Sequence, residues 1–140
     1  MGPPVLLALI LFHGLIAIGA SLLAPRLGRR VFWWCALAPL AALVWAIWQA
    51  PSVVDGQVVT EHVDWVPELG LDLGFRFDAF SLLMVVIVSG IGVLVFVYSS
   101  SYFAGHESPK IGTLAAQLTA FSGAMFGLVV SDNVLLLFVF

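Results

Sequence analysis

Long apolar runs separated by short polar segments dominate the chain and predict helices that cross a membrane. Four such runs lack Asp, Glu, Lys and Arg: Val5 to Ala24, Val31 to Ala50, Ala79 to about Phe103, and Ile111 to Val130. Each is about as long as the roughly 20 residues that a helix needs to cross a bilayer. We therefore expect an all-α polytopic membrane protein with four complete transmembrane helices.

A fifth apolar run begins near Asn133 and reaches Phe140. As a helix it would be about 12 Å long, which is shorter than a bilayer core of about 30 Å. We expect it to be the start of a fifth transmembrane helix, so that residues 1–140 form a single membrane domain, the N-terminal fragment of a larger transporter protein. The first run is expected to remain as a span, because its basic residues follow the apolar core, whereas in a signal peptide they precede it.

A different pattern occupies the segment before the third run. From residue 71 to residue 78, LDLGFRFD, apolar residues alternate with polar or small ones, which is typical of a strand with one apolar face. Asp55 and Gly56 stand between two valine pairs, a sequence that a type I′ hairpin turn prefers. We expect residues 51–77 to form a β-containing loop in which a hairpin at Asp55 pairs with the later strand. An irregular loop is the alternative.

The positions of the basic residues predict the orientation of the chain. Arg26, Arg29 and Arg30 lie in the loop 25–30, and Lys110 ends the loop 104–110. The loop 51–77 carries five acidic residues and one basic residue, Arg76. Because Lys and Arg concentrate in cytoplasmic loops, we expect the two short loops to be cytoplasmic. The N-terminus and the loop 51–77 are then exterior, in a multi-pass protein of the cell membrane.

Composition narrows the function classes. The chain is 62% hydrophobic and 9% charged, with a mean hydropathy of +1.14, whereas a soluble domain carries about 25% charged residues. The net charge of -3 offers no basic cluster for nucleic acid, and the single cysteine, Cys35, cannot form an internal disulfide. No phosphate loop, metal-ligand spacing or nucleophile–base pair is visible. We expect the lipid bilayer as a partner, no cofactor or metal, no catalytic residue and no enzyme activity.

Two polar residues inside the predicted spans are candidates for an ion path. His13 lies about 12 Å from Val5 along a helix, near mid-bilayer, where an ionisable group suggests proton or ion movement. The alternative is a neutral imidazole that donates a hydrogen bond to a neighbouring helix. We favour this alternative, because the sequence shows no partner for the histidine. Gln117 lies in the fourth span, and its amide is better suited to hydrogen bonding between helices than to lining a channel.

Glycines in the predicted spans indicate close contacts between helices. Gly90 and Gly92 in the third span, and Gly123 and Gly127 in the fourth, remove side-chain bulk where another helix can approach. We interpret them as contacts within the chain. Contact with a partner protein of an assembly is the alternative.

Arg76 and Asp78 lie two apart, hence on one face of the strand, where they can pair with each other or with Glu68 or Asp132. A structural tether is favoured over an ion-binding site. The tryptophans near the ends of the second span are expected to anchor it at the headgroup level.

Several segments resemble a known family. WVPELGL from Trp65, FRFDAFSLL from Phe75, GIG from Gly90 and VSDNVLLLFVF from Val130 are similar to the N-terminal part of the large A-type subunit of Mrp-type multisubunit Na⁺/H⁺ antiporters. That large protein is itself similar to the antiporter-like, proton-pumping subunits of respiratory complex I. The resemblance extends from Trp65 to Phe140 and is vague before it. One departure is Ala79, where the family usually has glycine.

The resemblance implies a multi-helix ion translocator with Na⁺ and H⁺ as transported ions and other antiporter subunits as partners. In the family, the run at Asp132–Leu137 is followed by a Trp-Glu pair whose glutamate carries protons, and this sequence stops at Phe140. No established translocation residue maps onto the chain, so we expect it not to transport ions alone. One alternative is a proton-translocating subunit of a complex I-type NADH-quinone oxidoreductase. The other is a short membrane protein that scaffolds partners.

Overall fold

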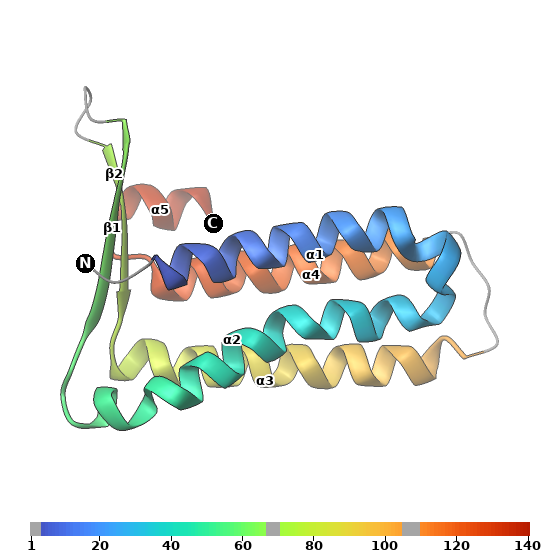
Figure 1. Cartoon of the computed structure of the whole chain (residues 1–140), viewed down its shortest axis with the longest axis horizontal. Helices are drawn as coiled ribbons and strands as arrows, with labels where there is room; N and C mark the ends of the chain where they lie inside the picture. The colour runs from blue at the N-terminus through green and yellow to red at the C-terminus, as the bar shows by residue number, and fades with distance from the viewer. Residues whose placement is uncertain (1–3, 67–70, 105–109) are drawn as a thin grey trace.

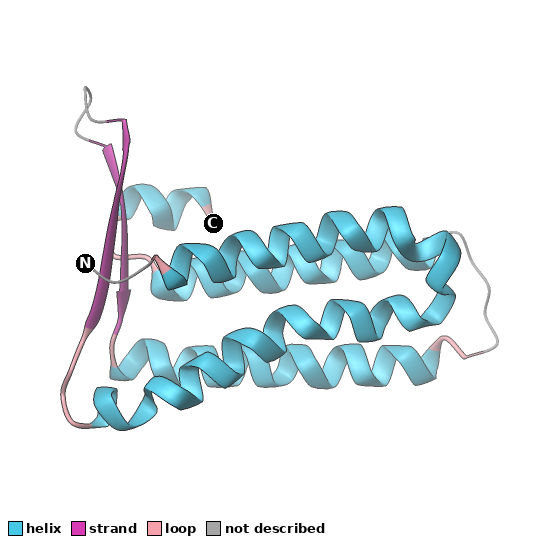
Figure 2. Cartoon of the chain, viewed as in Figure 1, coloured by secondary structure: helices cyan, strands magenta, loops and turns pink. Residues whose placement is uncertain are grey.

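The computed structural model describes residues 4–66, 71–104 and 110–140, which form a mostly helical chain with one small sheet (Figures 1 and 2). The elements in chain order are α1 (Val5–Leu27), a 3₁₀ turn η1 (Gly28–Arg30), α2 (Val31–Val54), β1 (Val59–Val66), β2 (Leu71–Phe77), α3 (Ala79–Tyr102), α4 (Lys110–Val130) and α5 (Val134–Val139). The helical class and the strand before the third long helix are confirmed.

Three helical stretches are long and apolar enough to cross a membrane: Val5–Val54, Ala79–Tyr102 and Lys110–Val130. The first contains 50 residues and includes α1, η1 and α2. The chain reverses within it at η1, where Gly28 adopts a φ of 52°, a backbone conformation that glycine reaches without steric cost. Figure 1 shows α2 running back from this turn, so the stretch consists of two helices of opposite direction.

The helices pack side by side, and the sheet stands across one end of them. In Figure 1, α1 runs antiparallel to α4, and α2 runs antiparallel to α3. The sheet lies at the end where α1 begins and α4 finishes, and η1 lies at the opposite end. The packing therefore separates the arginine-rich turn from the strand-forming segment by the length of the helices.

The hairpin predicted at Asp55 is wrong, because α2 runs past its expected end and uses this dipeptide as a C-terminal cap. A type I′ turn needs positive φ at both central residues, but Asp55 has a φ of -73° and only Gly56, at 86°, is positive. The amide of Gly56 donates to the carbonyl of Val53 (3.0 Å), and that of Gln57 to Ser52 (3.0 Å). These two bonds form a Schellman motif, which ends helices at glycine.

The sheet has two antiparallel strands, with Val59 opposite Phe77 and Val63 opposite Leu73. The predicted strand at residues 71–77 is therefore confirmed, but its partner is the segment that follows the α2 cap. The predicted alternation holds on β2, because Phe75 (1% exposed) and Phe77 (0%) are buried while Arg76 is exposed.

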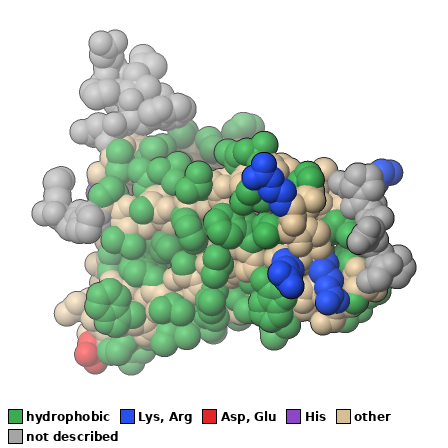
Figure 3. All heavy atoms as spheres, turned by 45° about the vertical axis from the view of Figure 1, so that its right-hand side comes forward, with side chains coloured by type: hydrophobic (Ala, Val, Ile, Leu, Met, Phe, Trp, Pro, Cys, Tyr) green, Lys and Arg blue, Asp and Glu red, His purple; other side chains and the backbone are tan. Residues whose placement is uncertain are grey.

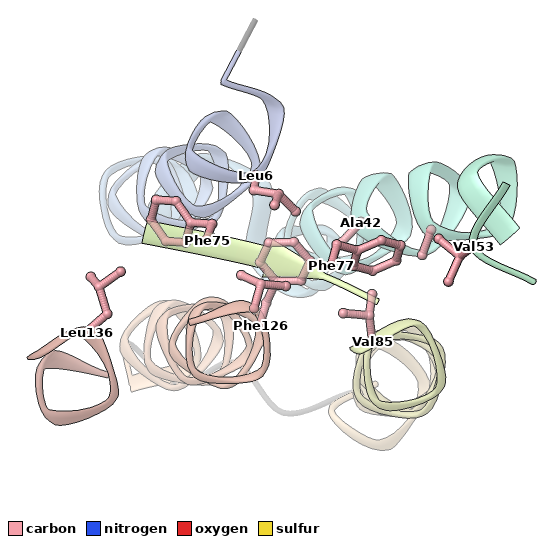
Figure 4. Close-up of a cluster of buried hydrophobic side chains, with 10 residues drawn as sticks. Leu6, Ala42, Val53, Phe75, Phe77, Val85, Phe126 and Leu136 are labelled. Atoms are coloured by element: carbon pink, nitrogen blue, oxygen red, sulfur yellow. The ribbon is translucent and has the colours of Figure 1, made fainter. Parts of the chain in front are cut away.

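Both buried phenylalanines of β2 enter the core of the helix bundle. Figure 4 shows them among side chains from the five helices: Leu6, Ala42, Val53, Val85, Phe126 and Leu136. Trp45 of α2 also packs on Phe77, with ring centroids 4.8 Å apart. Burying a phenylalanine side chain away from water contributes about 1.5 to 3 kcal/mol. The sheet thus closes the bundle at this end as part of its core.

Hydrogen bonds fix both strands of the sheet to the helices. On the β1 side, the Glu61 carboxylate accepts from the amide of Leu6 (2.9 and 3.0 Å) and, at 3.4 Å, from that of Leu7. On the β2 side, the amide of Asp132 donates to the carbonyl of Gly74 (2.9 Å) in the segment between α4 and α5. The sheet therefore joins the first turn of α1 to the end of α4.

The outer surface of the helices is apolar. Leu22, Leu94 and Phe80 are each about two-thirds or more exposed, at 73%, 68% and 67%. Figure 3 shows hydrophobic side chains spread along the helices, with Lys and Arg gathered near one end. A soluble monomer rarely exposes an apolar patch of more than a few hundred Å². This surface fits a multi-pass membrane protein.

The contact between Glu61 and α1 generates a stability prediction. Replacing Glu61→Gln removes the charge and one of two acceptor oxygens at the positive end of α1, so we expect about 1 kcal/mol of destabilisation. The amides of Leu6 and Leu7 should also exchange hydrogen faster, as measured by mass spectrometry in detergent micelles. Asp132→Asn is the matched control, because Asp132 bonds to the sheet through its backbone. Unchanged exchange at Leu6 in Glu61→Gln would contradict the capping role.

Candidate functional site

His13 lies in the interface between α1 and α4 and is only 1% exposed. Its Nδ1 is 2.8 Å from the carbonyl oxygen of Leu9, one turn earlier on α1. A carbonyl can only accept, so Nδ1 carries the hydrogen and donates it. The ring stacks on Phe126 of α4 with centroids 5.9 Å apart. The hydrogen bond is thus local to α1, whereas the neighbouring helix contributes an aromatic surface.

Glycines of α4 make the close approach to α1 possible. A Cβ placed on Gly123 would lie 2.6 Å from the Cβ of His13, and a Cβ on Gly112 would overlap that of Ala24. On each helix the two positions are eleven residues apart, which is about three helical turns and therefore one face. The two antiparallel helices pack along one seam of small residues, with His13 in it.

Two buried polar atoms beside this seam have no hydrogen-bond partner among the described residues. They are Nε2 of His13 and Oγ of Ser122. Ser122 also faces α3, since its Oγ would be 3.4 Å from a Cβ on Gly92. Unsatisfied buried polar atoms are uncommon and call for a reason such as an ordered water, an ion or a functional role.

The other predicted residues in the spans have different surroundings. A Cβ on Gly92 would lie 3.2 Å from Pro39 of α2, so α2, α3 and α4 approach one another there, and one on Gly127 would lie 2.7 Å from the Phe140 ring. A Cβ on Gly90 would meet nothing within 4 Å in the part of the chain that the structure describes. Gln117 is exposed on α4, so it does not join His13.

Arg76 and Asp78, which the sequence predicts at the membrane face, form a helix cap. Asp78 is the N-cap of α3, and its Oδ1 accepts from the amides of Phe80 (3.1 Å) and Ser81 (3.0 Å). Its Oδ2 lies 3.2 Å from Nε of Arg76. The Ser81 amide bond and then the Arg76 side chain hold the pKa of Asp78 below its usual range. The structure therefore pairs Arg76 with Asp78 rather than with Asp132, while Glu68 lies outside the described residues.

Two polar residues with structural roles were not identified from the sequence. Asn133 accepts from the amide of Leu136 (2.8 Å), capping α5, and donates through Nδ2 to the carbonyl of Asp72 (3.0 Å). An Asn directly before an apolar run is a helix-start signal, so the first role was accessible. Glu61 gave no such signal, because its partner Leu6 is 55 residues away.

The described residues hold no group of three or more His, Cys, Asp or Glu side chains that could bind a metal ion. The closest approach to one is a pair, His62 and Asp72, whose Nδ1 and Oδ2 atoms are 3.2 Å apart on the exposed face of the sheet. Cys35 is buried in the helix core near η1.

The α1–α4 seam predicts a position-specific effect of adding a methyl group. Gly123→Ala should destabilise the fold by about 1 to 3 kcal/mol, because its Cβ would overlap a backbone-attached atom that cannot rotate away. His13→Ala should not relieve this cost, since it keeps the Cβ. Unfolding in mixed micelles with SDS measures the change. Gly90→Ala is the matched control and should be neutral, and equal losses at Gly90 and Gly123 would contradict the seam.

The Asp78 cap predicts a pH dependence. Because the pKa of Asp78 is lower in the folded chain, its ionised form stabilises the fold above the unfolded-state pKa of about 3.9, and this contribution is lost as pH falls through the folded-state pKa. Asp78→Asn keeps a capping oxygen but not the charge. The stability difference between wild type and Asp78→Asn should therefore shrink on acidification from pH 7 to pH 3, measured by thermal unfolding. A constant difference would exclude the ionised cap.

Comparisons with known proteins agree on one group. Residues 65–110 match the family described as NADH-Ubiquinone oxidoreductase (complex I), chain 5 N-terminus. The A1 subunit of the Na(+)/H(+) antiporter from Staphylococcus aureus is 32% identical over 108 residues, which is 77% of this chain and 13% of that protein. The same protein from strain JH9 gives the same figures.

A solved structure extends the match to nearly the whole chain. A chain of the Mrp complex from Dietzia sp. DQ12-45-1b aligns with a TM-score of 0.78 and 30% identity, covering 96% of this chain and 14% of that one. This chain thus spans about 13% of the length of the curated relatives that it matches. The resemblance to the N-terminal part of the large A-type subunit of Mrp-type Na⁺/H⁺ antiporters is therefore confirmed.

Proposed function

We propose that this chain supplies the N-terminal helices of the large subunit of a multisubunit antiporter that exchanges Na⁺ for H⁺. The observation that carries the proposal is the agreement of sequence and structure: 32% identity to an antiporter A1 subunit, and a TM-score of 0.78 to a chain of an Mrp complex. In this role the chain is part of a secondary transporter, and its partners are the lipid bilayer, the other antiporter subunits and the two transported ions.

A complex I-type NADH-quinone oxidoreductase subunit is the second candidate. It is favoured by the match of residues 65–110 to the complex I chain 5 family. That match covers β2 and α3 but not α1 and α2, whereas the Mrp structural match covers 96% of the chain. The antiporter assignment is therefore the better supported of the two.

We further propose that α1, α2, α3 and α4 each cross the membrane and that α5 begins a fifth crossing. These four helices have 21 to 24 residues, which corresponds to about 32 to 36 Å and exceeds a bilayer core of about 30 Å. The arginines of the α1–α2 turn and the sheet lie at opposite ends of the bundle (Figure 1). Positive residues favour the cytoplasm, so the N-terminus and sheet are assigned to the exterior.

Among the residues of this chain, His13 is the better-supported candidate for contact with an ion path. Its Nδ1 is committed to Leu9, so Nε2, which is buried without a partner among the described residues, is the atom that would exchange a proton. Gln117 would act only through its exposed position on α4, facing lipid or another part of the assembly. The glycine seam and the Arg76–Asp78 cap have structural roles in this scheme.

A chimera tests the function. The matching N-terminal segment of the Staphylococcus aureus A1 subunit is replaced by this chain, and the complex is expressed in an antiporter-deficient bacterial host. Everted vesicles should show sodium-dependent collapse of the pH gradient by acridine orange fluorescence. The chimera with Gly90→Ala should retain sodium–proton exchange. In the chimera with Gly123→Ala, the exchange activity should fall in proportion to the amount of assembled complex. A fully assembled chimera without sodium-dependent exchange would contradict the proposal.

The polypeptide alone is expected to be inactive in reconstituted proteoliposomes. It corresponds to about 13% of the length of the A1 relative. No pH change should follow a sodium jump beyond that of empty liposomes. Sodium-dependent proton movement that His13→Ala abolishes would overturn this expectation and would make His13 part of a complete pathway.

A further inference from the structure

A hollow opens at the arginine-rich end of the bundle, opposite the sheet. Its volume is about 450 Å³, and it is lined by Arg29, Arg30, Trp33, Ser100 and Ser101. The first two belong to η1, Trp33 to the first turn of α2, and the serines to the last turn of α3. The antiparallel packing of α2 on α3 therefore brings together two polar segments that are about 70 residues apart in the sequence.

The lining groups favour an anion with several acceptor oxygens. Each guanidinium presents five N–H donors in a planar fork that matches a phosphate group. Ser101 is exposed and adds a hydroxyl, whereas the Ser100 hydroxyl donates to the carbonyl of Val97 (2.7 Å) and offers only lone pairs. Among the described residues, no carboxylate lines the hollow or forms an ion pair with either arginine.

The position of the hollow favours a lipid over a free anion. Trp33 is 57% exposed, and exposed tryptophans concentrate at the headgroup level of membranes. Leu37 lies one turn after Trp33 on α2 and is exposed on the same side. Val97 lies one turn before Ser101 on α3 and is also exposed on the same side as that serine. Figure 3 shows Lys and Arg side chains with hydrophobic side chains next to them near one end of the molecule. A basic hollow thus continues into an apolar surface suited to acyl chains.

We propose that this hollow binds the phosphate headgroup of an anionic phospholipid, with acyl chains lying along Leu37 and Val97. The volume falls within the range of about 300 to 1,000 Å³ of small-molecule sites. Arg29 and Arg30 hold the phosphate, and Trp33 covers it at the interface. The site lies at the end of α1 that is remote from the sheet. Lipid binding there is a function separate from the proposed ion exchange, because it does not depend on which ions the assembly moves.

The test uses the full chain in nanodiscs of phosphatidylcholine with increasing phosphatidylglycerol, read out by tryptophan fluorescence and by native mass spectrometry of retained lipid. A hydrogen bond from an arginine of the hollow to the phosphate contributes about 1 kcal/mol, which is about fivefold in affinity. Arg29→Gln and Arg30→Gln should each weaken phosphatidylglycerol retention by about fivefold, and the double variant by about 25-fold. Arg30→Lys should recover part of the loss, because it restores the charge without the planar fork.

Arg26→Gln is the matched control, since Arg26 lies in the last turn of α1 but does not line the hollow. It should leave retention near the wild-type value. Equal losses from Arg26→Gln and Arg29→Gln would reduce the effect to general surface charge and overturn the site. Displacement of phosphatidylglycerol by millimolar inorganic phosphate would identify a free-anion site instead, and binding of poly-glutamate without lipid retention would identify a protein partner. Thermal unfolding of each variant shows that the loss is not one of folding.

Discussion

The first amides of a helix have no hydrogen-bond partners within it, and the arrangement of this chain depends on how these amides are satisfied at the sheet end of the bundle. Three helices begin beside the sheet. Each is capped by a side chain from a strand or from a short connecting segment. Glu61 of β1 caps α1, Asp78 at the end of β2 caps α3, and Asn133 in the short segment after α4 caps α5. Capping therefore fixes three helices to one sheet.

This attachment explains why so small a sheet is ordered. Two isolated antiparallel strands are marginally stable in water. Here Phe75 and Phe77 are removed from water by the ends of the helices, and the outer edge of β2 forms a bridge with Ser131. The helices thus supply the buried face that the two strands lack, and the strands supply the acceptors that the helix ends lack.

Between the ends, a different constraint operates, because lipid provides no hydrophobic drive for helix association. The α1–α4 seam relies on glycine to bring backbones close, and the side chain that fills the resulting space is His13. A tight seam is compatible with a buried imidazole because Leu9 on the same helix accepts its Nδ1 hydrogen. The second nitrogen, Nε2, stays buried without a hydrogen-bond partner among the described residues.

The parts of this fold that depend on local pattern were predictable from the sequence. Apolar runs located the long helices to within a few residues, and the alternation from Leu71 to Phe77 located β2. The Asp55–Gly56 prediction failed because a glycine with positive φ serves a hairpin and a helix cap equally well, and only the helical state of Ser52 and Val53 decides between them.

The contacts within the candidate site were less accessible, since they depend on packing between distant segments. Nothing near Glu61 indicates that it faces the start of α1, and nothing in the sequence distinguishes Gly92, which contacts Pro39, from Gly90, which contacts nothing described. The identity of each residue was visible, but its direction around the helix was not. Contacts between residues of different helices and strands could therefore be identified only from the three-dimensional structure.

The two ends of the bundle differ in a way that has a functional consequence. At the sheet end, the carboxylates of Glu61 and Asp78 accept hydrogen bonds from the backbone amides at the starts of α1 and α3. At the other end, Arg29 and Arg30 border an open hollow. Among the described residues, neither of these two arginines forms an ion pair with a carboxylate. A headgroup bound in the proposed lipid site would therefore contact η1 and the first turn of α2, at the end of the bundle opposite the sheet.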